Sequence, residues 1–548
     1  MEVGASATRA APAPRGARAP DGWTAFTVVC AVLVAGPLLG LPIAFITGHG
    51  DALTRFSGLL PEALLSTLGL LVGVGLGALV LGTGLAALVS FCDFPGRSWL
   101  EWALVLPLAV PGYVFTLFAL GTLPAGGAAI RSLIGAVAIF TLVLYPYVYL
   151  LARAAFLSQS ATLFEAARGL GLSRREAILR VGLPLARPAI FGGVALALME
   201  ALADFGTVNL LGVHTFTDAI YKVWFNAFDR QAAMQLATFL MGITLTLLAL
   251  ERLARGRARY AAHGRALPPI RLRGPAAAAA VMAPLVLLAV VVAAPLAQLA
   301  AWAVDAVDDG LLAPEFAAAA RNSLLLALMS AVLVGGLATL LAYGLRASRT
   351  RSSALAVRAA TIGYGLPGSV VAVAVIVPLA WLDHRIDDAS GSILGIDPGL
   401  LLTGTVIGLF CAYTVRFLAL AFQAVEASLG RIPDELDEAA RGLGSDRLDV
   451  LARVHVPLIR AGLVTAALLV FTEVMKELPA TMLLRPVGGD TLAIEVWQAT
   501  SESLYRTAAL PALLIVLVGL VPVILMIRLS GRRVSEPEAA VTAGTWTR

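Results

Sequence analysis

The chain has 548 residues, of which 59% are hydrophobic and 14% are charged. A soluble domain carries about 25% charged residues, so this composition excludes a soluble enzyme, a secreted protein or a disordered scaffold as a description of the whole chain. The net charge of +5 does not indicate nucleic-acid binding, because the arginines concentrate between apolar segments, as membrane topology requires.

Apolar segments long enough to cross a bilayer recur along the whole chain. A hydrocarbon core about 30 Å thick needs about 20 apolar residues per helix. By this length the sequence predicts twelve spans, at 24–46, 64–91, 100–122, 130–151, 188–212, 233–250, 277–303, 323–345, 360–381, 400–423, 461–484 and 508–528. The predicted fold class is therefore an all-α integral membrane protein.

The spans and the charged segments between them predict the domain organisation. We expect a disordered cytoplasmic N-terminus at 1–23, a first six-helix unit at 24–251, an Arg-rich cytoplasmic linker at 252–276, a second six-helix unit at 277–530 and a cytoplasmic tail at 531–548. The positive-inside rule places both termini and the linker in the cytoplasm, with the linker near anionic lipid headgroups. The first span is too long for a signal-peptide core, so it is expected to remain as an anchor.

An internal repeat relates the two units. The stretch at 165–184 recurs at 438–457 with eleven of twenty positions identical and no gap, and the same offset of 273 relates Trp224 to Trp497. Each unit has an even number of spans, so the two repeated loops lie on the same side of the membrane. This parallel repeat argues against a secondary carrier built from inverted repeats.

Each repeated loop carries the signals of a folded knob. A short helix-forming run ends at Gly171 or Gly444, since glycine allows the left-handed conformation that stops a helix. Ser173 or Asp446 then restarts a helix as an N-cap, and a proline is expected to end that second helix and turn the chain into the next span. We predict that both loops, at 152–187 and 424–460, form compact cytoplasmic knobs.

The repeated loops resemble the cytoplasmic signature of the permease family of binding-protein-dependent ABC importers. That signature is EAA, three residues, Gly, nine residues, and then a hydrophobic residue and a terminal Pro, and both copies fit it. The matching positions are Glu165, Ala166, Ala167, Gly171, Pro184, Glu438, Ala439, Ala440, Gly444 and Pro457. The resemblance implies that these loops couple the permease to two copies of an ABC ATPase subunit, that an extracytoplasmic substrate-binding protein delivers the substrate, and that the chain lies in a bacterial inner membrane.

The sequence carries no site for ATP hydrolysis of its own. A Walker A loop needs a lysine directly before Ser or Thr, but Lys222 precedes Val223 and Lys476 precedes Glu477. The three cysteines and five histidines are scattered and form no pattern of metal ligands. We therefore expect a transport permease that is not an enzyme, with no cofactor and no resident metal.

Two further segments indicate the substrate. Residues 199–233 and 471–498 resemble the ferric-iron branch of the family, in which both permease halves are fused into one chain. Thiamine, polyamine or another small solute is the alternative substrate within the same permease role. A stand-alone secondary transporter is the alternative from another class.

Ionisable residues inside predicted spans are the candidates for a translocation path, because burying them in a membrane is costly unless they face a cavity or a partner. The candidate path residues are Glu200, Asp204, Glu473, Glu477, Pro111 and Pro367. Carboxylates that converge on the axis between the units would suit a hard cation such as Fe³⁺. Alternatively, they cap helix breaks near Gly206 and Pro479, or pair with Lys476 and Arg416.

Two further pairs of residues at equivalent positions of the repeat each have two alternative roles. Pro111 and Pro367 act either as hinges that open backbone groups to a path or as simple packing kinks. Trp224 and Trp497 act either as interfacial anchors or as part of a docking surface for a binding protein.

Overall fold

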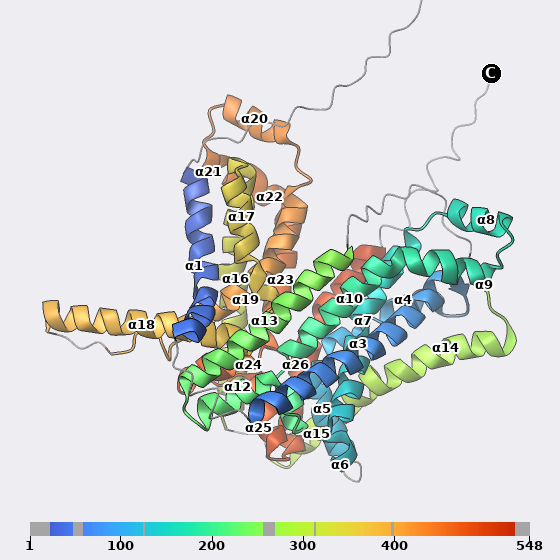
Figure 1. Ribbon diagram of the computed structural model, residues 1–548, viewed down its shortest axis with the longest axis horizontal. Helices are drawn as coiled ribbons and strands as arrows, with labels where there is room; N and C mark the ends of the chain where they lie inside the picture. Colours follow the sequence, from blue (N-terminus) through green and yellow to red (C-terminus); the bar gives the residue numbers. More distant parts are fainter. Residues whose placement is uncertain are drawn as a thin grey trace, which may run out of the picture.

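The computed structural model describes residues 22–47, 58–123, 127–255, 269–311, 314–395 and 399–531. The described residues are almost entirely helical (Figure 1), apart from β1 (Cys92–Asp93), which pairs in parallel with β2 (Ile270–Arg271). Most of the predicted N-terminus, the middle of the predicted linker and nearly all of the predicted tail lie outside the described residues.

The helices of the first unit follow the predicted spans. They are α1 (Gly22–Thr47), α3 (Leu59–Phe91), α4 (Arg97–Ala103), α5 (Gly112–Thr122), α6 (Gly127–Ile130), α7 (Leu133–Leu157), α8 (Ala161–Gly169), α9 (Arg174–Ala177), α10 (Leu183–Ala203), α11 (Gly206–Leu210), α12 (Phe216–Phe225) and α13 (Arg230–Arg255).

The second unit repeats this order. Its helices are α14 (Gly274–Leu288), α15 (Ala294–Asp308), α16 (Phe316–Ser348), α17 (Arg351–Ala360), α18 (Gly368–Leu394), α19 (Val406–Leu429), α20 (Asp434–Gly442), α21 (Arg447–Asp449), α22 (Val456–Leu458), α23 (Arg460–Met475), α24 (Pro479–Leu484), α25 (Leu492–Ser501) and α26 (Tyr505–Gly531).

Ten helices in the described residues are long and apolar enough to cross a membrane, and the number rises to twelve if each of two bent pairs forms one span. This confirms an all-α membrane protein built from two repeated units. The predicted third span, 100–122, is a bent pair, with α4 and its following 3₁₀ turn at 87° to α5. The predicted spans 188–212 and 461–484 are also interrupted, because α10 ends at Ala203 and α23 ends at Met475.

Pro111 and Pro367 do not lie within continuous helices. Each follows a 3₁₀ turn and forms the N-cap of the next helix, α5 or α18. Proline has no backbone N–H, and the residue before it disfavours the helical conformation, so one helix ends and another begins there. Both prolines are helix boundaries. At Pro111 the boundary bends the predicted third span by 87°, as a proline kink would, whereas Pro367 marks the start of α18.

The expected turn at Pro184 was also wrong. A π-turn at Ile178–Gly182 joins α9 to α10, and Pro184 lies in the first turn of α10, so the helix continues into the membrane. A proline near a helix start removes an N–H that has no partner in any case, and the wider π-turn accommodates the change. In the second unit the chain does turn, at Ile459, where the two helical segments meet at 79°.

The first span of each unit, α1 or the span from α14 to α15, packs against the other unit. In α1, Trp23 contacts Tyr343 of α16 edge-on with ring centroids 5.0 Å apart, and Thr27 fits against Gly344. In α15, Trp302 fits against Gly121 of α5 so closely that a Cβ at Gly121 would overlap the indole. Through these reciprocal contacts each half packs against the other.

Small residues allow the long helices of the first unit to approach closely, as is common for helices packed within a membrane. A Cβ at Gly193 of α10 would lie 2.6 Å from the Cα of Val148 in α7. We therefore expect Gly193→Ala to force the two helices apart and destabilise the protein by about 1–3 kcal/mol.

Gly84→Ala in α3 is the matched control, because nothing lies within 4 Å of its added Cβ. This change is expected to leave stability unchanged or raise it, since alanine is the better helix former. Thermal unfolding midpoints of the two variants in detergent test the difference. Equal midpoints would contradict the close packing of α7 and α10.

Candidate functional site

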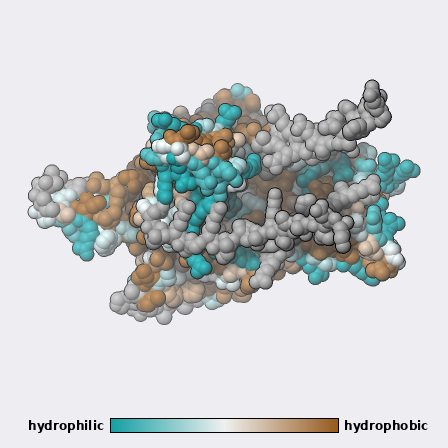
Figure 2. Space-filling view, turned by 90° about the horizontal axis from the view of Figure 1, so that it is seen from above, coloured by the Kyte–Doolittle hydropathy of each residue, from teal (hydrophilic) through white to brown (hydrophobic). Residues whose placement is uncertain are grey.

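The two repeated loops form knobs on the same side of the molecule. Figure 1 shows α8 and α20 projecting upward from separate halves, and Figure 2, which looks down on that side, shows hydrophilic surface over both. Gly171 and Gly444 have φ of 91° and 88°, which confirms the predicted left-handed stops. Ser173 forms a capping box with Glu176, and Asp446 accepts from the amide three residues on, which confirms both predicted N-caps.

The knobs present similar tips to the solvent. Glu165 and Glu438 are exposed. Between the two glycines of each motif lies a leucine, Leu170 or Leu443, whose exposed fraction is 86% or 88%. Sequence reasoning missed these leucines, although their position in the identical stretch of both repeats marks them.

The first knob is held to the membrane helices by aromatic packing. Phe164 of α8 is buried, and its ring centroid lies 6.0 Å from that of Phe91 in α3. Phe91 also contacts Phe156 of α7 at 5.0 Å. Gly182 leaves the space that the Phe164 ring fills, because a Cβ there would lie 3.1 Å from the ring.

The second knob is held by polar side chains at the same repeat positions. Asp437 stands where the first unit has Phe164, and fully buried His455 stands where it has Gly182. Asp437 accepts from Arg346 Nε at 2.9 Å and lies 2.7 Å from His455 Nε2. Repeat symmetry predicts the same backbone in both knobs, but it does not predict this exchange of an aromatic contact for an ionic one.

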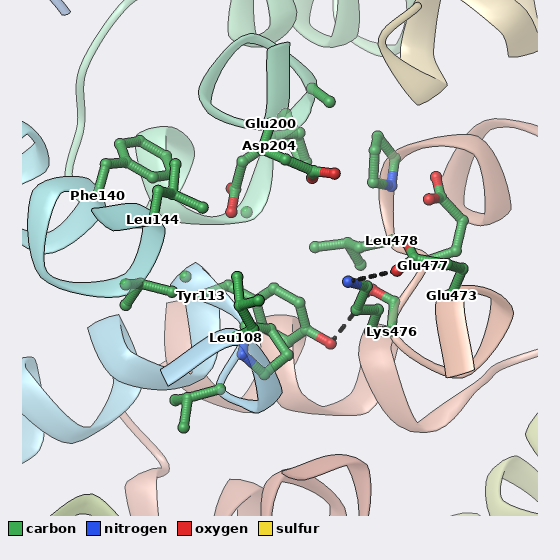
Figure 3. Close-up of a pocket in the computed structure, with 18 of the residues that line it drawn as sticks. Leu108, Tyr113, Phe140, Leu144, Glu200, Asp204, Glu473, Lys476, Glu477 and Leu478 are labelled. Carbon is green, nitrogen blue, oxygen red and sulfur yellow. Dashed lines mark hydrogen bonds and ion pairs between the residues drawn. The ribbon is translucent and has the colours of Figure 1, made fainter. Parts of the chain in front are cut away.

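A cavity of about 90 Å³ lies between the two halves. The predicted carboxylates Glu200, Asp204, Glu473 and Glu477 all line it, and Figure 3 shows the first two facing the others across the space. Of the two predicted prolines, Pro111 lines the cavity and Pro367 is not among its lining residues. The structure thus brings together five of the six candidate path residues.

Two of the carboxylates cap the broken helices. Asp204 accepts from the backbone N–H of Thr207 at 2.7 Å, at the start of α11. Glu477 accepts from the backbone N–H of Ala480 at 3.0 Å, at the start of α24. These contacts confirm the capping alternative, because each carboxylate satisfies an amide that the helix start leaves unpaired.

The second half also supplies cationic partners. Arg416 Nη1 lies 2.9 Å from Glu477 Oε1, and Lys476 Nζ lies 2.8 Å from Glu473 Oε1. The pairing alternative is therefore confirmed together with the capping one. The equivalent positions in the first half are Val143 and Ala203 in the sequence, so this half contributes no such cation to the cavity.

Hydroxyl groups complete the lining on the side of the first half. Tyr147 donates to Glu200 Oε1 at 3.3 Å, and Tyr113 also lines the cavity. Sequence reasoning missed these tyrosines, because a tyrosine in an apolar span carries no signal of its direction. Among the lining residues, four carboxylates face two basic side chains, so the cavity is acidic.

A second, smaller cavity adjoins the first. It shares Tyr147, Glu200 and Glu473 with it and adds Met199 and Tyr364. Met199 lies further along α10 toward the knob than Glu200, so the space continues in that direction. Among the described residues, no three His, Cys, Asp or Glu side chains are placed to hold a metal ion together.

Comparison with known proteins relates both halves of the chain to one family. Residues 63–255 and 331–536 each match the family described as binding-protein-dependent transport system inner membrane component. An Fe(3+)-transport system permease protein of Haemophilus influenzae is 27% identical over 518 residues, which covers 91% of this chain and 98% of the relative.

Other relatives match less of the chain. A probable ABC transporter permease protein of Sinorhizobium fredii is 25% identical and covers 79% of this chain and 81% of the relative. A molybdate/tungstate transport system permease protein of Thermococcus kodakarensis is 27% identical over 36% of this chain and 79% of the relative. A solved bacterial alginate ABC transporter aligns over 47% of this chain and 94% of its own, at 16% identity and a TM-score of 0.36.

Proposed function

Because this chain belongs to the family of binding-protein-dependent transport system inner membrane components, we propose that it forms the translocation path of an ATP-driven ABC importer for ferric iron. It is a transport permease with both permease halves in one chain. We propose unit boundaries at 24–251 and 277–530, joined by the linker at 252–276. The observation that carries the proposal is an acidic cavity on the axis between two halves, each of which bears a knob on the same side.

The chemistry of the cavity supports a cation as the substrate. Ferric iron is a hard cation that favours oxygen ligands, and carboxylate and phenol oxygens line the space. The acidic excess would repel an oxyanion such as molybdate. The caps and ion pairs occupy part of the carboxylate oxygens, which weakens binding, and a transported ion must be able to leave its site.

The two knobs support coupling to separate ATPase subunits. We propose that two copies of an ABC ATPase subunit grip the knobs through the residues of the repeated motif, from Glu165 to Gly171 and from Glu438 to Gly444. ATP binding then favours one state of the knobs, and because each knob is followed directly by α10 or α23, that state biases one state of the cavity. A binding protein on the opposite side delivers the substrate, and both termini lie in the cytoplasm of a bacterial cell.

Neutralising the carboxylates of the first half tests the path. Glu200→Gln and Asp204→Asn keep the acceptor oxygens for Tyr147 and Thr207 but remove both charges. We expect the double variant to lose uptake of radioactive Fe³⁺ by the whole transporter by at least about tenfold, while the ATPase subunits still copurify. The loss of two negative charges weakens the attraction of the cavity for a cation, and about 1.4 kcal/mol already corresponds to tenfold.

Asp309→Asn is the matched control, because Asp309 lies at the surface in a pair that is half exposed. It should transport at the wild-type rate. Unchanged Fe³⁺ uptake by the double variant would contradict the path. Uptake of thiamine or spermidine instead of Fe³⁺ by the wild type would show that the substrate is an organic cation.

A further inference from the structure

A cluster of aromatic side chains joins the two halves on the face opposite the knobs. Trp497 of α25 lies against Phe205 and Tyr221 of the first half, with ring centroids 5.9 Å and 6.0 Å apart. Its indole N–H donates to Asn209 Oδ1 of α11 at 3.1 Å. We call these four residues, Phe205, Asn209, Tyr221 and Trp497, the outer clasp.

The buried carboxylate of Asp218 determines which atom of the Asn209 side-chain amide faces the Trp497 indole. Asp218 of α12 is 2% exposed, and its Oδ1 accepts from Asn209 Nδ2 at 2.8 Å. Its other oxygen, Oδ2, lies 2.8 Å from Lys222 Nζ. Because the amide nitrogen of Asn209 is engaged with an acceptor, its oxygen points to the other side and accepts from Trp497. The two hydrogen bonds of Asn209 therefore fix the orientation of its amide toward the Trp497 indole.

The clasp lies at one end of the acidic cavity. Phe205 belongs to both, since it lines the cavity and packs against Trp497. The adjoining space at Met199 extends from the cavity in the other direction, toward the knobs. Next to Phe205, a Cβ at Gly206 would lie 2.8 Å from Leu478 Cδ2, so the halves also meet closely there. Phe205 thus connects the clasp to the wall of the cavity.

The clasp is one-sided, although the chain is a repeat. Trp224 is the repeat equivalent of Trp497, but the position equivalent to Asn209 is Met482. A thioether is only a weak acceptor, so the equivalent hydrogen bond has no strong partner. The hydrogen bond from Trp497 to Asn209 therefore has no strong equivalent at Trp224.

We propose that the outer clasp is the outer gate of the translocation path. Withdrawal of Trp497 from Asn209 and from the Phe205 and Tyr221 rings separates α25 from α11 and opens the acidic cavity to a substrate arriving from outside. The hydrogen bond and the aromatic contacts hold the gate shut in the described conformation. This inference rests on the proposed function, since it names the residues that control access to the same path.

Thiol labelling of the cavity tests the gate without any transported substrate. A reporter Ala203→Cys in the cavity wall is placed in a chain whose Cys30, Cys92 and Cys411 are replaced by serine. The whole transporter, with its ATPase, is treated with a membrane-impermeant maleimide from the face opposite the knobs. Trp497→Phe keeps an aromatic ring but loses the N–H, and we expect it to speed labelling about fivefold, as loss of one hydrogen bond allows.

Trp224→Phe is the matched control, because it makes the same chemical change at the repeat-equivalent position, and it should label at the wild-type rate. Asn209→Ala should match Trp497→Phe, since it removes the other partner of the bond. Unchanged labelling in both clasp variants, or an equal rise in Trp224→Phe, would overturn the proposal. If the clasp variants label faster but the wild-type transporter does not take up Fe³⁺, the result would refute ferric iron as the substrate and still support the gate.

Cross-linking provides the converse test. Cysteines at positions 209 and 497 joined by a short bis-thiosulfonate reagent should hold the gate shut, so that uptake stops and returns when the link is reduced. Bound ATPase should remain in both conditions, because the knobs are at the other face. Uptake at the same rate before and after cross-linking would overturn the gate.

Discussion

Arg416→Met is expected to destabilise the permease by about 3–5 kcal/mol, because it leaves a buried carboxylate without its cation. Arg416 Nη1 lies 2.9 Å from Glu477 Oε1, and the two side chains are 11% and 4% exposed. Glu477 also caps α24, so it cannot move to water without leaving the amide of Ala480 unpaired. The thermal unfolding midpoint of the purified variant in detergent measures the loss.

Two further variants separate the buried pair from charge removal in general. Arg506→Met breaks a pair with Asp309 at 3.3 Å in which both side chains are 55% exposed, and a surface pair of this kind contributes about 0–1 kcal/mol. Arg416→Met combined with Glu477→Gln removes both buried charges, keeps an acceptor oxygen for the amide of Ala480, and should recover much of the stability, but not uptake. If Arg416→Met and Arg506→Met unfolded at the same midpoint, the buried pair would not have the role assigned to it.

Leu170→Asp together with Leu443→Asp is expected to release the ATPase from the permease. Each leucine is almost fully exposed at the tip of a knob, so the change should leave the fold of the permease intact. A partner that covers the tips would bury an unpaired charge at each, and the loss of an interface centre weakens binding by about 30-fold or more per site. Copurification of the ATPase with tagged permease gives the readout.

Each single variant should retain part of the binding, because the second knob remains intact. Leu504→Asp is the control, since Leu504 is half exposed on the opposite face, between α25 and α26. Full recovery of ATPase with the double variant would show that the tips lie outside the interface.

Local signals were sufficient to predict the membrane helices and the knobs. Long apolar runs predicted the spans, and the positions of Gly171, Ser173 and Asp446 predicted the stop and the caps of each knob. Each of these features depends on a few neighbouring residues, so a local sequence pattern is enough to predict it. The breaks after Ala203 and Met475 were given only as an alternative, because the charged residues that follow them, Asp204, Lys476 and Glu477, are also what a translocation path would contain.

Contacts between distant segments could not be predicted in the same way. Arg416 and Glu477 are 61 positions apart, and Asn209 and Trp497 are 288 positions apart. The sequence showed that charged and aromatic side chains occupy the spans, and left open whether they cap, pair or face a path. Their partners depend on how whole helices pack, which hydropathy does not encode.

The repeat predicted the backbone better than the side chains. Both knobs follow the same course, yet Phe164 anchors one and Asp437 anchors the other. Each half of a fused chain is free to change its own side chains, because the identity of the two halves is no longer required by symmetry. For the same reason, the basic side chains that line the cavity, Arg416 and Lys476, come from the second half alone.

The position of the two knobs in the cell is the claim on which coupling depends. Leu170→Cys and Leu443→Cys place a thiol at each exposed tip, in a chain without its three native cysteines. An impermeant maleimide applied to inverted membrane vesicles should label both positions, and the same reagent applied to right-side-out vesicles should label neither. Labelling of either tip in right-side-out vesicles would contradict the account.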